Sequence, residues 1–474
     1  MTLENKKENL SEWYEEVIKK TQLADYSPVK GCIVYLPYGY AIWKNIMNEF
    51  SKYLDDVQEV YFPLFIPKRI LEKEAEHFKG FKPEVAWVTK AGDSDLEEPL
   101  AVRPTSETIM YSYIAESELI KSWRDLPLKI IQWCNVVRME TKATKPFLRA
   151  REFLWHEGHT FHSSFEEAEE EARKRILQYK EFVEKYLAIP VIVGKKSEAE
   201  KFAGAHTTYT IETLMPDGRA LQCGTSHNLS NNFSKVFGIY FTDKDEKRKL
   251  VYQTSWGFST RLIGAIIMVH GDDLGLVLPP KVAPIQVIII PIYYSEEEKE
   301  KVLEKCREIA EKLKKFRVKV DDREQYTPGY KFNNWELRGV PIRIEIGKSE
   351  IETKEITIFR RDTMKREKVK ESELEKKIEE LIEEIQKNLY EKAKEFLESR
   401  IKVAKTFEEF KKFIEEGYMV LADHCGKIEC EEKIKEETKA TSRVIELNNE
   451  NPISGKCIYC NENAKYKAYF AKSY

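Results

Sequence analysis

The chain has 474 residues, too many for one ordinary hydrophobic core, so two or three domains are expected. Charged residues make up 34% of it, yet the net charge is only −3, which excludes a uniformly basic nucleic-acid coat but allows local basic patches. No run approaches the roughly 18 apolar residues that span a bilayer. Because the start is polar and mixed in charge, we expect a cytoplasmic protein without a membrane segment.

The stretch PFLRAREFLWHEGHTFH, residues 146–162, has the first strong chemical signature. In a helix, His156, His159 and His162 would follow at i,i+3 and could bind a metal ion. In a strand, one face would carry Arg149, Arg151, Phe153, Trp155, Glu157 and His159. Ser164 and Glu167 form a capping box that begins a helix directly afterwards, so residues 147–161 are predicted to be a strand.

The polar face of this predicted strand favours a ligand pocket. Unpaired buried charges cost several kcal/mol each, so such a face needs a partner. A second strand precedes it in IIQWCNVVRMET and carries Arg138 and Glu140. Two adjacent strands with arginines indicate a pocket for an anionic ligand; the alternative is a half-exposed edge strand with an accidental aromatic stripe.

A different pattern begins near residue 281, after Pro279 and Pro280. Strands are predicted at IQVIIIPI, RVKVDD and PIRIEIG, and a helix from the capping box at Ser295. A short helix around KFNNWELRG, the charged hairpin EITIFRRDTMKREKVK and a long helix from ESELEKK complete the region. This alternation predicts a compact α/β domain over residues 281–400.

The tail, residues 401–474, begins with the amphipathic helix TFEEFKKFIEEGY and ends in a cysteine cluster. Cys425 and Cys430 form one close pair, and Cys457 and Cys460 form another, which is the spacing of a zinc site. Disulfides are the alternative, but a cytosolic chain disfavours them. Four thiolates would close the coordination shell, so the predicted zinc is structural.

The two arginine strands and their loop, about residues 130–160, resemble motif 2 of the class II aminoacyl-tRNA synthetases. Residues 31–67 resemble motif 1, which builds a dimer interface, and residues 252–280 resemble motif 3. Within the class, RPTSETIMY, FLRAREFLWHEGH and QCGTSHNLSNNFSKVF resemble the prolyl-tRNA synthetases of the archaeal and eukaryotic type. The similarity extends over essentially the whole chain.

The resemblance implies an α+β catalytic domain on an antiparallel sheet at residues 1–280. An α/β anticodon-binding domain at 281–400 and a small α/β zinc-binding domain at 401–474 would follow. The implied enzyme is a homodimer that uses ATP and Mg²⁺ to form prolyl-adenylate and then transfers proline to tRNA(Pro). Between motifs 2 and 3 there is no room for a large editing insertion, so no hydrolysis of mischarged alanyl-tRNA in cis is expected.

The resemblance also assigns residues to the two substrates. Arg138, Arg149 and Arg261 would be catalytic. The expected ATP contacts are Arg138 at the α-phosphate, Glu140 and Phe153 at adenine, Arg149 and Arg261 at the γ-phosphate, and Gln222 and Thr225 opposite Arg138. The expected proline pocket contains Thr105, Glu107, Arg138, Trp155, Glu157, His159 and His227, with Phe81 near it. Thr105 and Glu107 would accept the two N–H bonds of the secondary ammonium group.

In the second domain, Glu336, Arg343 and Lys365 are the candidates for anticodon binding. The first two could recognise guanine edges and the third could meet phosphate, although a scaffold role explains the charges equally well. Family members also end in a tyrosine whose carboxylate points toward the active site, and Tyr474 matches it.

Three alternatives remain open on sequence alone. The chain could charge tRNA with another amino acid such as threonine, although the expected catalytic-domain zinc ligands are not found. It could be a silent tRNA-binding paralogue, although that predicts loss of Arg138, Arg149 or Arg261, and all three are present. A metallohydrolase would need a metal at the three histidines of residues 156–162, where the H-E-x-x-H spacing is absent.

Overall fold

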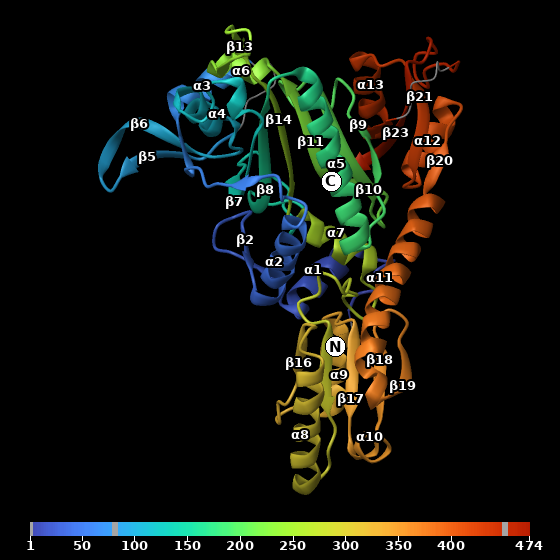
Figure 1. The fold of residues 1–474 in the computed structure, drawn as a ribbon. Coiled ribbons are helices and arrows are strands. Elements are labelled where there is room, and N and C mark those ends of the chain that lie inside the picture. The colour runs from blue at the N-terminus through green and yellow to red at the C-terminus, as the bar shows by residue number, and fades with distance from the viewer. Residues whose placement is uncertain (1–2, 78–83, 448–453) are drawn as a thin grey trace.

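A computed structural model describes residues 3–77, 84–447 and 454–474 (Figure 1). The large antiparallel sheet and its helices form the upper body, a smaller α/β unit lies below it, and the C-terminal module stands beside the sheet. Within the described ranges, no helix combines the length and apolar character needed to cross a membrane.

The part of the chain up to helix α7 is built on an antiparallel sheet, with β3 (Gln58–Glu59) added in parallel at its edge. From that edge inward the order is β3, β7 (Leu128–Val137), β8 (Glu152–His162), β14 (Tyr252–Ser259), β11 (Arg219–Ser230), β10 (Thr207–Leu214) and β9 (Ile192–Lys195). Helix α5 (Phe165–Leu187) contacts the middle strands and covers one face of the sheet. Ser164 caps this helix by accepting from the Glu167 backbone N–H, as predicted.

The segments around this sheet carry the other two motif-like stretches. Helix α2 (Pro37–Ser51) leads to β3 and β4 (Phe65–Pro67), and β14 leads into α7 (Arg261–His270). The smaller elements around the sheet are α1 (Leu10–Thr21), β1 (Ala24–Tyr26), β2 (Ile33–Tyr35), α3 (Lys68–His77), β5 (Trp87–Ala91), β6 (Ser94–Val102), α4 (Glu107–Glu116), α6 (Asn232–Phe237), β12 (Tyr240–Thr242) and β13 (Arg248–Leu250).

Strand β8 begins five residues later than the predicted start at residue 147. Residues 146–150 instead form a tight turn, in which Phe147 has a left-handed φ of 63° and Lys145 bridges to Arg149. The turn is held by Tyr14, whose hydroxyl donates to the Pro146 carbonyl at 2.6 Å. The period-2 alternation therefore holds from Phe153 onward, and Arg149 lies in the turn.

The lower unit is a five-stranded sheet with two parallel and two antiparallel pairings. Its order is β16 (Val318–Val320), β15 (Val287–Pro291), β17 (Ile342–Ile346), β18 (Glu355–Arg360) and β19 (Lys365–Lys370). Its helices are α8 (Glu296–Lys312), α9 (Pro328–Leu337), α10 (Lys348–Thr353) and α11 (Leu374–Ser399). The predicted hairpin is present, and α11 extends upward to the C-terminal module. Ser295 caps α8 by accepting from the Glu298 backbone N–H, but the Glu298 carboxylate accepts from the Tyr294 N–H instead of from Ser295, so the predicted capping box is half formed.

The C-terminal module continues the large upper sheet, a connection that the sequence did not predict. It contains β20 (Ile401–Val403), α12 (Phe407–Glu415), β21 (Met419–His424), α13 (Ile428–Thr438), β22 (Thr441–Glu446) and β23 (Tyr466–Ser473). Strand β22 pairs with β9, and β23 pairs with β11. A buried ionic cluster crosses this junction, where Arg443 contacts Glu212 at 2.8 Å and Glu212 also binds Lys196. The module is therefore joined to the first part of the chain by strand pairing and by buried ion pairs.

Candidate active site

A cavity of about 500 Å³ lies over strands β8, β14 and β11. Its walls also include the residue that follows β7 and the starts of helices α4 and α7. Alternation along β8 explains the placement, because Glu157 and His159 line the cavity while His156 packs on Tyr179 of α5. The cavity therefore occupies the sheet face opposite α5.

One part of the cavity is lined by arginines and aromatic rings. The guanidinium group of Arg138 lies 5.4 Å from the ring centres of both Phe153 and Trp155, and its Nε donates to the Pro104 carbonyl at 3.0 Å. Arg261 begins helix α7, where the helix dipole favours an anion. Burial, together with the charges of Arg138 and Arg149, lowers the pKa of Arg261 to about 10. This part of the cavity suits a polyanion.

The other part is lined by carboxylates and hydroxyl groups at the start of α4 and on β8. Thr105 donates a short hydrogen bond to Glu107, and both side chains are buried. Glu157 faces His159 at 3.1 Å. Burial acts to lower the pKa of His159, but the hydrogen bond and charge of Glu157 outweigh it, so that pKa is raised. Since His159 offsets the charge of Glu157, Glu107 is the carboxylate left to match a bound cation.

The other two histidines of the 146–162 stretch serve the core. Burial lowers the pKa of His156 well below its usual range, and its ring packs on Phe258 and Trp133. His162 bonds to the Thr160 hydroxyl at 2.8 Å, and burial lowers its pKa to about 4. Among the described residues, His156, His159 and His162 do not come together in a group that could hold a metal ion. The strand interpretation is supported over the histidine-metal alternative.

The predicted ATP and proline residues largely come together. The cavity walls contain Thr105, Glu107, Arg138, Glu140, Phe153, Trp155, Glu157, His159, Gln222, Thr225, His227 and Arg261. Arg149 is exposed in the turn before β8 and does not line the cavity. Phe81 lies outside the described residues. Tyr474 hydrogen bonds to Asp217 and does not line the cavity either.

Sequence reasoning missed several residues at this cavity. Lys196 and Glu200 line it from the segment that follows β9, and Ser255 lines it from β14. The stretch GKKSEAEK has the composition of a solvated surface, so nothing local predicts a buried lysine. Alternation along β14 could have identified Ser255, since Ser255 pairs with His159 in the sheet register.

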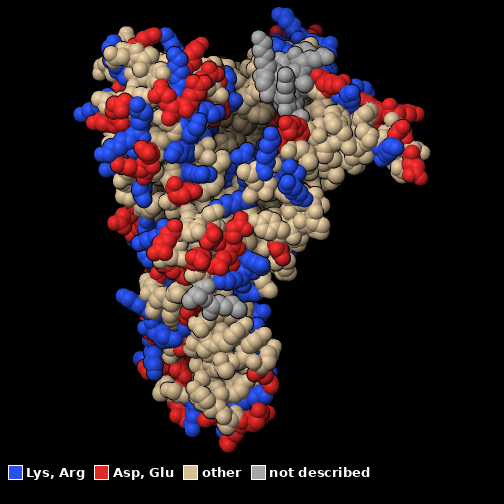
Figure 2. Space-filling view, turned by 180° about the vertical axis from the view of Figure 1, so that it is seen from behind, with Lys and Arg blue, Asp and Glu red and all other residues tan. Residues whose placement is uncertain are grey.

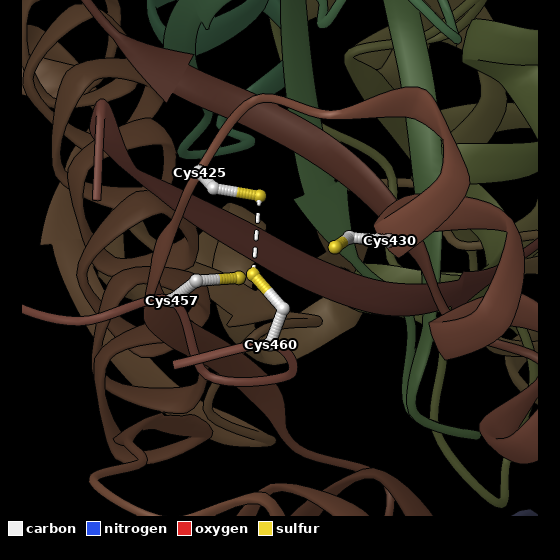
Figure 3. Close-up of side chains that lie close together, drawn as sticks. All are labelled: Cys425, Cys430, Cys457 and Cys460. Carbon is white, nitrogen blue, oxygen red and sulfur yellow. Dashed lines mark hydrogen bonds between the residues drawn. The ribbon is translucent and has the colours of Figure 1, made fainter. Parts of the chain in front are cut away.

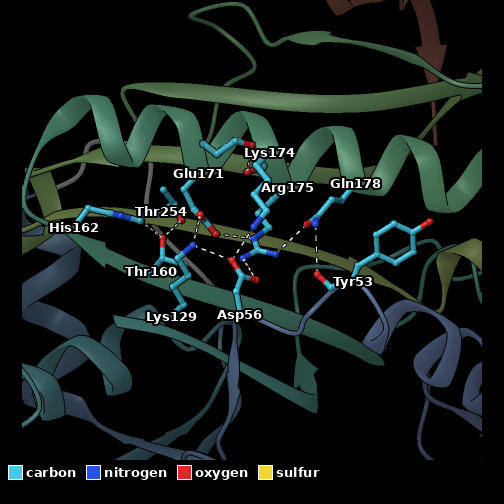
Figure 4. A network of polar contacts seen from close by, with 12 residues as sticks. Tyr53, Asp56, Lys129, Thr160, His162, Glu171, Lys174, Arg175, Gln178 and Thr254 are labelled. Atoms are coloured by element: carbon cyan, nitrogen blue, oxygen red, sulfur yellow. Dashed lines mark hydrogen bonds and ion pairs between the residues drawn. The ribbon is translucent and has the colours of Figure 1, made fainter. Parts of the chain in front are cut away.

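The face of the sheet under α5 carries a second polar cluster, but one that is closed on itself (Figure 4). Arg175 and Glu171 of α5 pair at 2.7 Å, and Glu171 also pairs with Lys129 of β7 at 2.8 Å. Asp56 joins both cations, at 2.8 Å from Arg175 and 2.9 Å from Lys129. Each of these charges has an opposite charge beside it, so we interpret this cluster as one that stabilises the fold.

Four cysteine sulfurs converge in the C-terminal module (Figure 3). The sulfurs of Cys425, Cys430, Cys457 and Cys460 all lie within 4.8 Å of one another. The 3.7 Å between Cys425 and Cys460 is far too long for a disulfide. It is close to the edge of a thiolate tetrahedron, about 3.8 Å for Zn–S bonds of about 2.3 Å. The donor set therefore fits zinc.

The three anticodon candidates lie in different environments. Lys365 is exposed at the start of β19, and Glu336 is partly buried on α9. Arg343 is buried between the rings of Phe332 and Phe359, each 4.0 Å away. Its guanidinium donates to Glu336 and Glu345. In this arrangement Arg343 holds Glu336 in place, and its Nε, Nη1 and Nη2 atoms each donate to a carboxylate.

Comparisons with known proteins agree with this architecture. Residues 87–270 match the tRNA synthetase class II core domain (G, H, P, S and T), and residues 286–381 match the anticodon binding domain. Residues 407–474 match the C-terminal domain of prolyl-tRNA synthetase. The fold and the matched core define a class II aminoacyl-tRNA synthetase.

Full-length relatives narrow the assignment further. The chain is 54% identical to a proline–tRNA ligase of Natranaerobius thermophilus, over 98% of this chain and 97% of the relative. It is 51% identical to a proline–tRNA ligase of Alkaliphilus oremlandii, over 98% and 96%, and 49% identical to proline–tRNA ligase 2 of Bacillus cereus, over 98% and 97%. The chain belongs to the prolyl-tRNA synthetase family. These relatives are bacterial, so they do not establish the archaeal and eukaryotic type that the motifs resemble.

Proposed function

We propose that the chain activates L-proline with ATP, releases pyrophosphate, and transfers proline from the adenylate to the 3′ end of tRNA(Pro). The observation that carries this proposal is one cavity with two chemically different parts, cationic at Arg138 and Arg261 and anionic at Glu107, since Glu157 is already paired with His159. A triphosphate suits the first part and an amino acid's ammonium group suits the second. Family membership supports the same reaction.

The proline carboxylate is already a nucleophile at neutral pH, so the site needs no general base. Attack on the α-phosphate requires alignment of the two substrates and stabilisation of the charge that develops on phosphorus oxygens. Arg138 is proposed to bind the α-phosphate and the carboxylate, while Arg261 and Arg149 bind the γ-phosphate. Magnesium would arrive with ATP, because this ion is usually held by substrate phosphates and one or two carboxylates, and would offset triphosphate charge.

Adenine and proline are proposed to occupy opposite sides of Arg138. Phe153 would stack on adenine, Glu140 would accept from its amino group, and Gln222 and Thr225 would contact the nucleotide from β11. Thr105 and Glu107 would accept the two N–H bonds of proline, with Trp155, Glu157, His159 and His227 around the ring. Burial lowers the pKa of His227 to about 3, so the His227 side of the pocket is neutral and suits an apolar ring.

We further propose that residues 281–400 bind the anticodon. The contacts of Arg343 support an assignment in which Glu336 recognises a base edge, Arg343 orients Glu336, and Lys365 meets phosphate. Acidic and basic side chains are interspersed over the face in Figure 2, and basic ones gather below its upper hollow. Such local patches suit a tRNA better than a uniform basic coat would.

The remaining proposals concern the domain boundaries, the zinc site, the type of synthetase and the oligomeric state. We assign the catalytic domain to residues 1–280 and a zinc-binding domain to 401–474, with Zn²⁺ held by four thiolates in a structural role. The C-terminal domain and the short span between motifs 2 and 3 support the archaeal and eukaryotic type, without alanyl-tRNA editing in cis. We also propose a cytoplasmic homodimer joined through the motif 1 region, where Tyr61 and Phe65 are exposed.

The decisive experiment is ATP–pyrophosphate exchange by the full chain with each of the twenty amino acids. Strong exchange with proline is expected, with weak exchange at most for alanine and cysteine, because an apolar pocket discriminates small size differences by only about 1–3 kcal/mol. Exchange with threonine alone, or with no amino acid, would overturn the proposal. Metal analysis of the same protein should give one zinc per chain, lost on changing Cys457→Ser.

A further inference from the structure

Gln132 of β7 is a fully buried amide beneath the proposed proline pocket. It lies directly opposite Glu157 in the pairing of β7 with β8, so both side chains point to the cavity side of the sheet. Gln132 does not itself line the cavity. Any influence of this amide on a substrate must therefore pass through a neighbouring residue.

All three hydrogen-bonding groups of the Gln132 amide are engaged. Its Nε2 donates to the Glu157 carboxylate at 2.9 Å and to the Ser106 hydroxyl at 2.8 Å. Its Oε1 accepts from the Phe62 backbone N–H at 2.9 Å. The amide thus connects three separate segments, which are strand β8, the start of α4, and the chain between β3 and β4.

The second oxygen of Glu157 is fixed from the opposite side. It accepts from the Ser106 backbone N–H at 3.3 Å and faces the Nε2 atom of His159 at 3.1 Å. The Nδ1 atom of His159 in turn bonds to the Tyr111 hydroxyl at 2.9 Å. Glu157 is therefore held by Gln132 at Oε1 and by His159 at Oε2, and each of these partners is itself anchored.

We propose that Gln132 is a positioning residue for amino-acid recognition. It orients the Glu157 carboxylate and keeps it paired with His159, so that Glu107 remains available to the ammonium group of proline. Because Gln132 also binds Ser106, it fixes the chain between the two proposed proline ligands, Thr105 and Glu107. The nucleotide part of the cavity, around Arg138 and Arg261, makes no contact with this amide among the described hydrogen bonds. This inference rests on the proposed function.

This arrangement predicts a selective kinetic defect. In Gln132→Met, which keeps the volume and removes the amide, the KM for proline in pyrophosphate exchange should rise about tenfold, while the KM for ATP stays unchanged. A merely structural amide would instead lower the melting temperature and affect both KM values together. The control is Gln178→Met, because Gln178 is also a glutamine held by the protein, through two hydrogen bonds to Arg175 and to the Tyr53 carbonyl, but on the α5 face.

A second variant tests the donor role by pH. Gln132→Glu keeps an acceptor for the Phe62 N–H but places a carboxylate beside Glu157. Two adjacent carboxylates cannot both ionise easily, so protonation of one would restore a donor at lower pH. The ratio of the variant's proline KM to that of the wild type should therefore fall as pH is lowered from about 8 to about 6.

The outcomes are distinguishable. A selective rise in the proline KM for Gln132→Met, with pH rescue of Gln132→Glu, supports the positioning role. An unchanged proline KM, parallel rises in both KM values, or a pH-independent ratio would overturn it. Absence of proline-dependent exchange in the wild type would instead refute the proposed function.

Discussion

The two faces of strands β7 and β8 carry polar clusters of opposite design. Under α5, Glu171, Arg175, Lys129 and Asp56 contact one another, and each charge is paired within the protein. On the cavity face, Glu107 is buried and Arg138 is half-buried, and both lie beside open volume. Because successive residues of a strand point to opposite faces, Lys129 of β7 faces α5 while Glu157 of β8 lines the cavity; the other members of the two clusters come from α5, α4 and the segments beside the strands. The closed cluster holds the helix on the sheet, and the open one is left to bind a ligand.

The comparison predicts that changes on the cavity face remove activity and spare the fold. Arg138→Met should lower kcat/KM for proline-dependent exchange by about 10³-fold, because a fixed donor to developing phosphate charge is lost. The melting temperature should change little, because the guanidinium makes one described hydrogen bond, to the Pro104 carbonyl. Arg173→Met, on the exposed side of α5, is the control and should retain wild-type kinetics.

Changes on the α5 face should instead lower the stability of the fold and leave the activity of the folded protein nearly unchanged. Glu171→Gln leaves Arg175 and Lys129 short of a buried counter-charge, which should lower the free energy of unfolding by about 4 kcal/mol. Denaturant titration followed by tryptophan fluorescence measures this. The protein that remains folded should keep kcat/KM within about twofold, since the two clusters lie on opposite faces. A large loss of kcat/KM with unchanged stability would break the comparison.

The α5 face should also be acid-sensitive. Burial lowers the pKa of His162 to about 4, against 6.5 for an ordinary histidine. The unfolded chain therefore binds the proton first, and the stability contribution, full above pH 6.5, is lost as pH falls toward 4. The shift corresponds to about 3 kcal/mol. His162→Gln should flatten the stability profile between pH 4 and 6.5, whereas His206→Gln, at an exposed position, should not.

The smallest expected effect concerns Gly158, between Glu157 and His159. An added Cβ atom would lie 2.3 Å from the ring of Trp256, which packs on the α5 side. Gly158→Ala should therefore destabilise by about 2 kcal/mol through overpacking. Gly329→Ala, where a Cβ meets nothing within 4 Å, is the control and should be close to neutral. Equal melting temperatures for the two variants would contradict this packing.

Much of the cavity face was predictable because it depends on local alternation. Phe153, Trp155, Glu157 and His159 follow period 2, and the cap at Ser164 marks where the strand must end. The four-cysteine cluster was predictable because its spacing reflects coordination chemistry. Where the backbone departs from regular structure the prediction was wrong, as at the turn that takes Arg149 out of the strand.

What the sequence could not supply is long-range pairing. The parallel pairing of Arg219 with Lys472, and the contact of Arg443 with Glu212, join segments more than 200 residues apart. Neither pairing has a local pattern, since β-sheet partners are chosen by three-dimensional packing. The same applies to Gln132, whose partners come from three segments, and to Arg343, which is buried between Phe332 and Phe359.

The most direct test of the two-face account is calorimetric binding of a non-hydrolysable prolyl-adenylate analogue, which would fill both parts of the cavity at once. We predict one binding site per chain, an affinity for the analogue that is at least about a hundredfold weaker in Arg138→Met, and an unchanged affinity in folded Glu171→Gln. Undiminished binding by Arg138→Met, or binding lost only in Glu171→Gln, would contradict it.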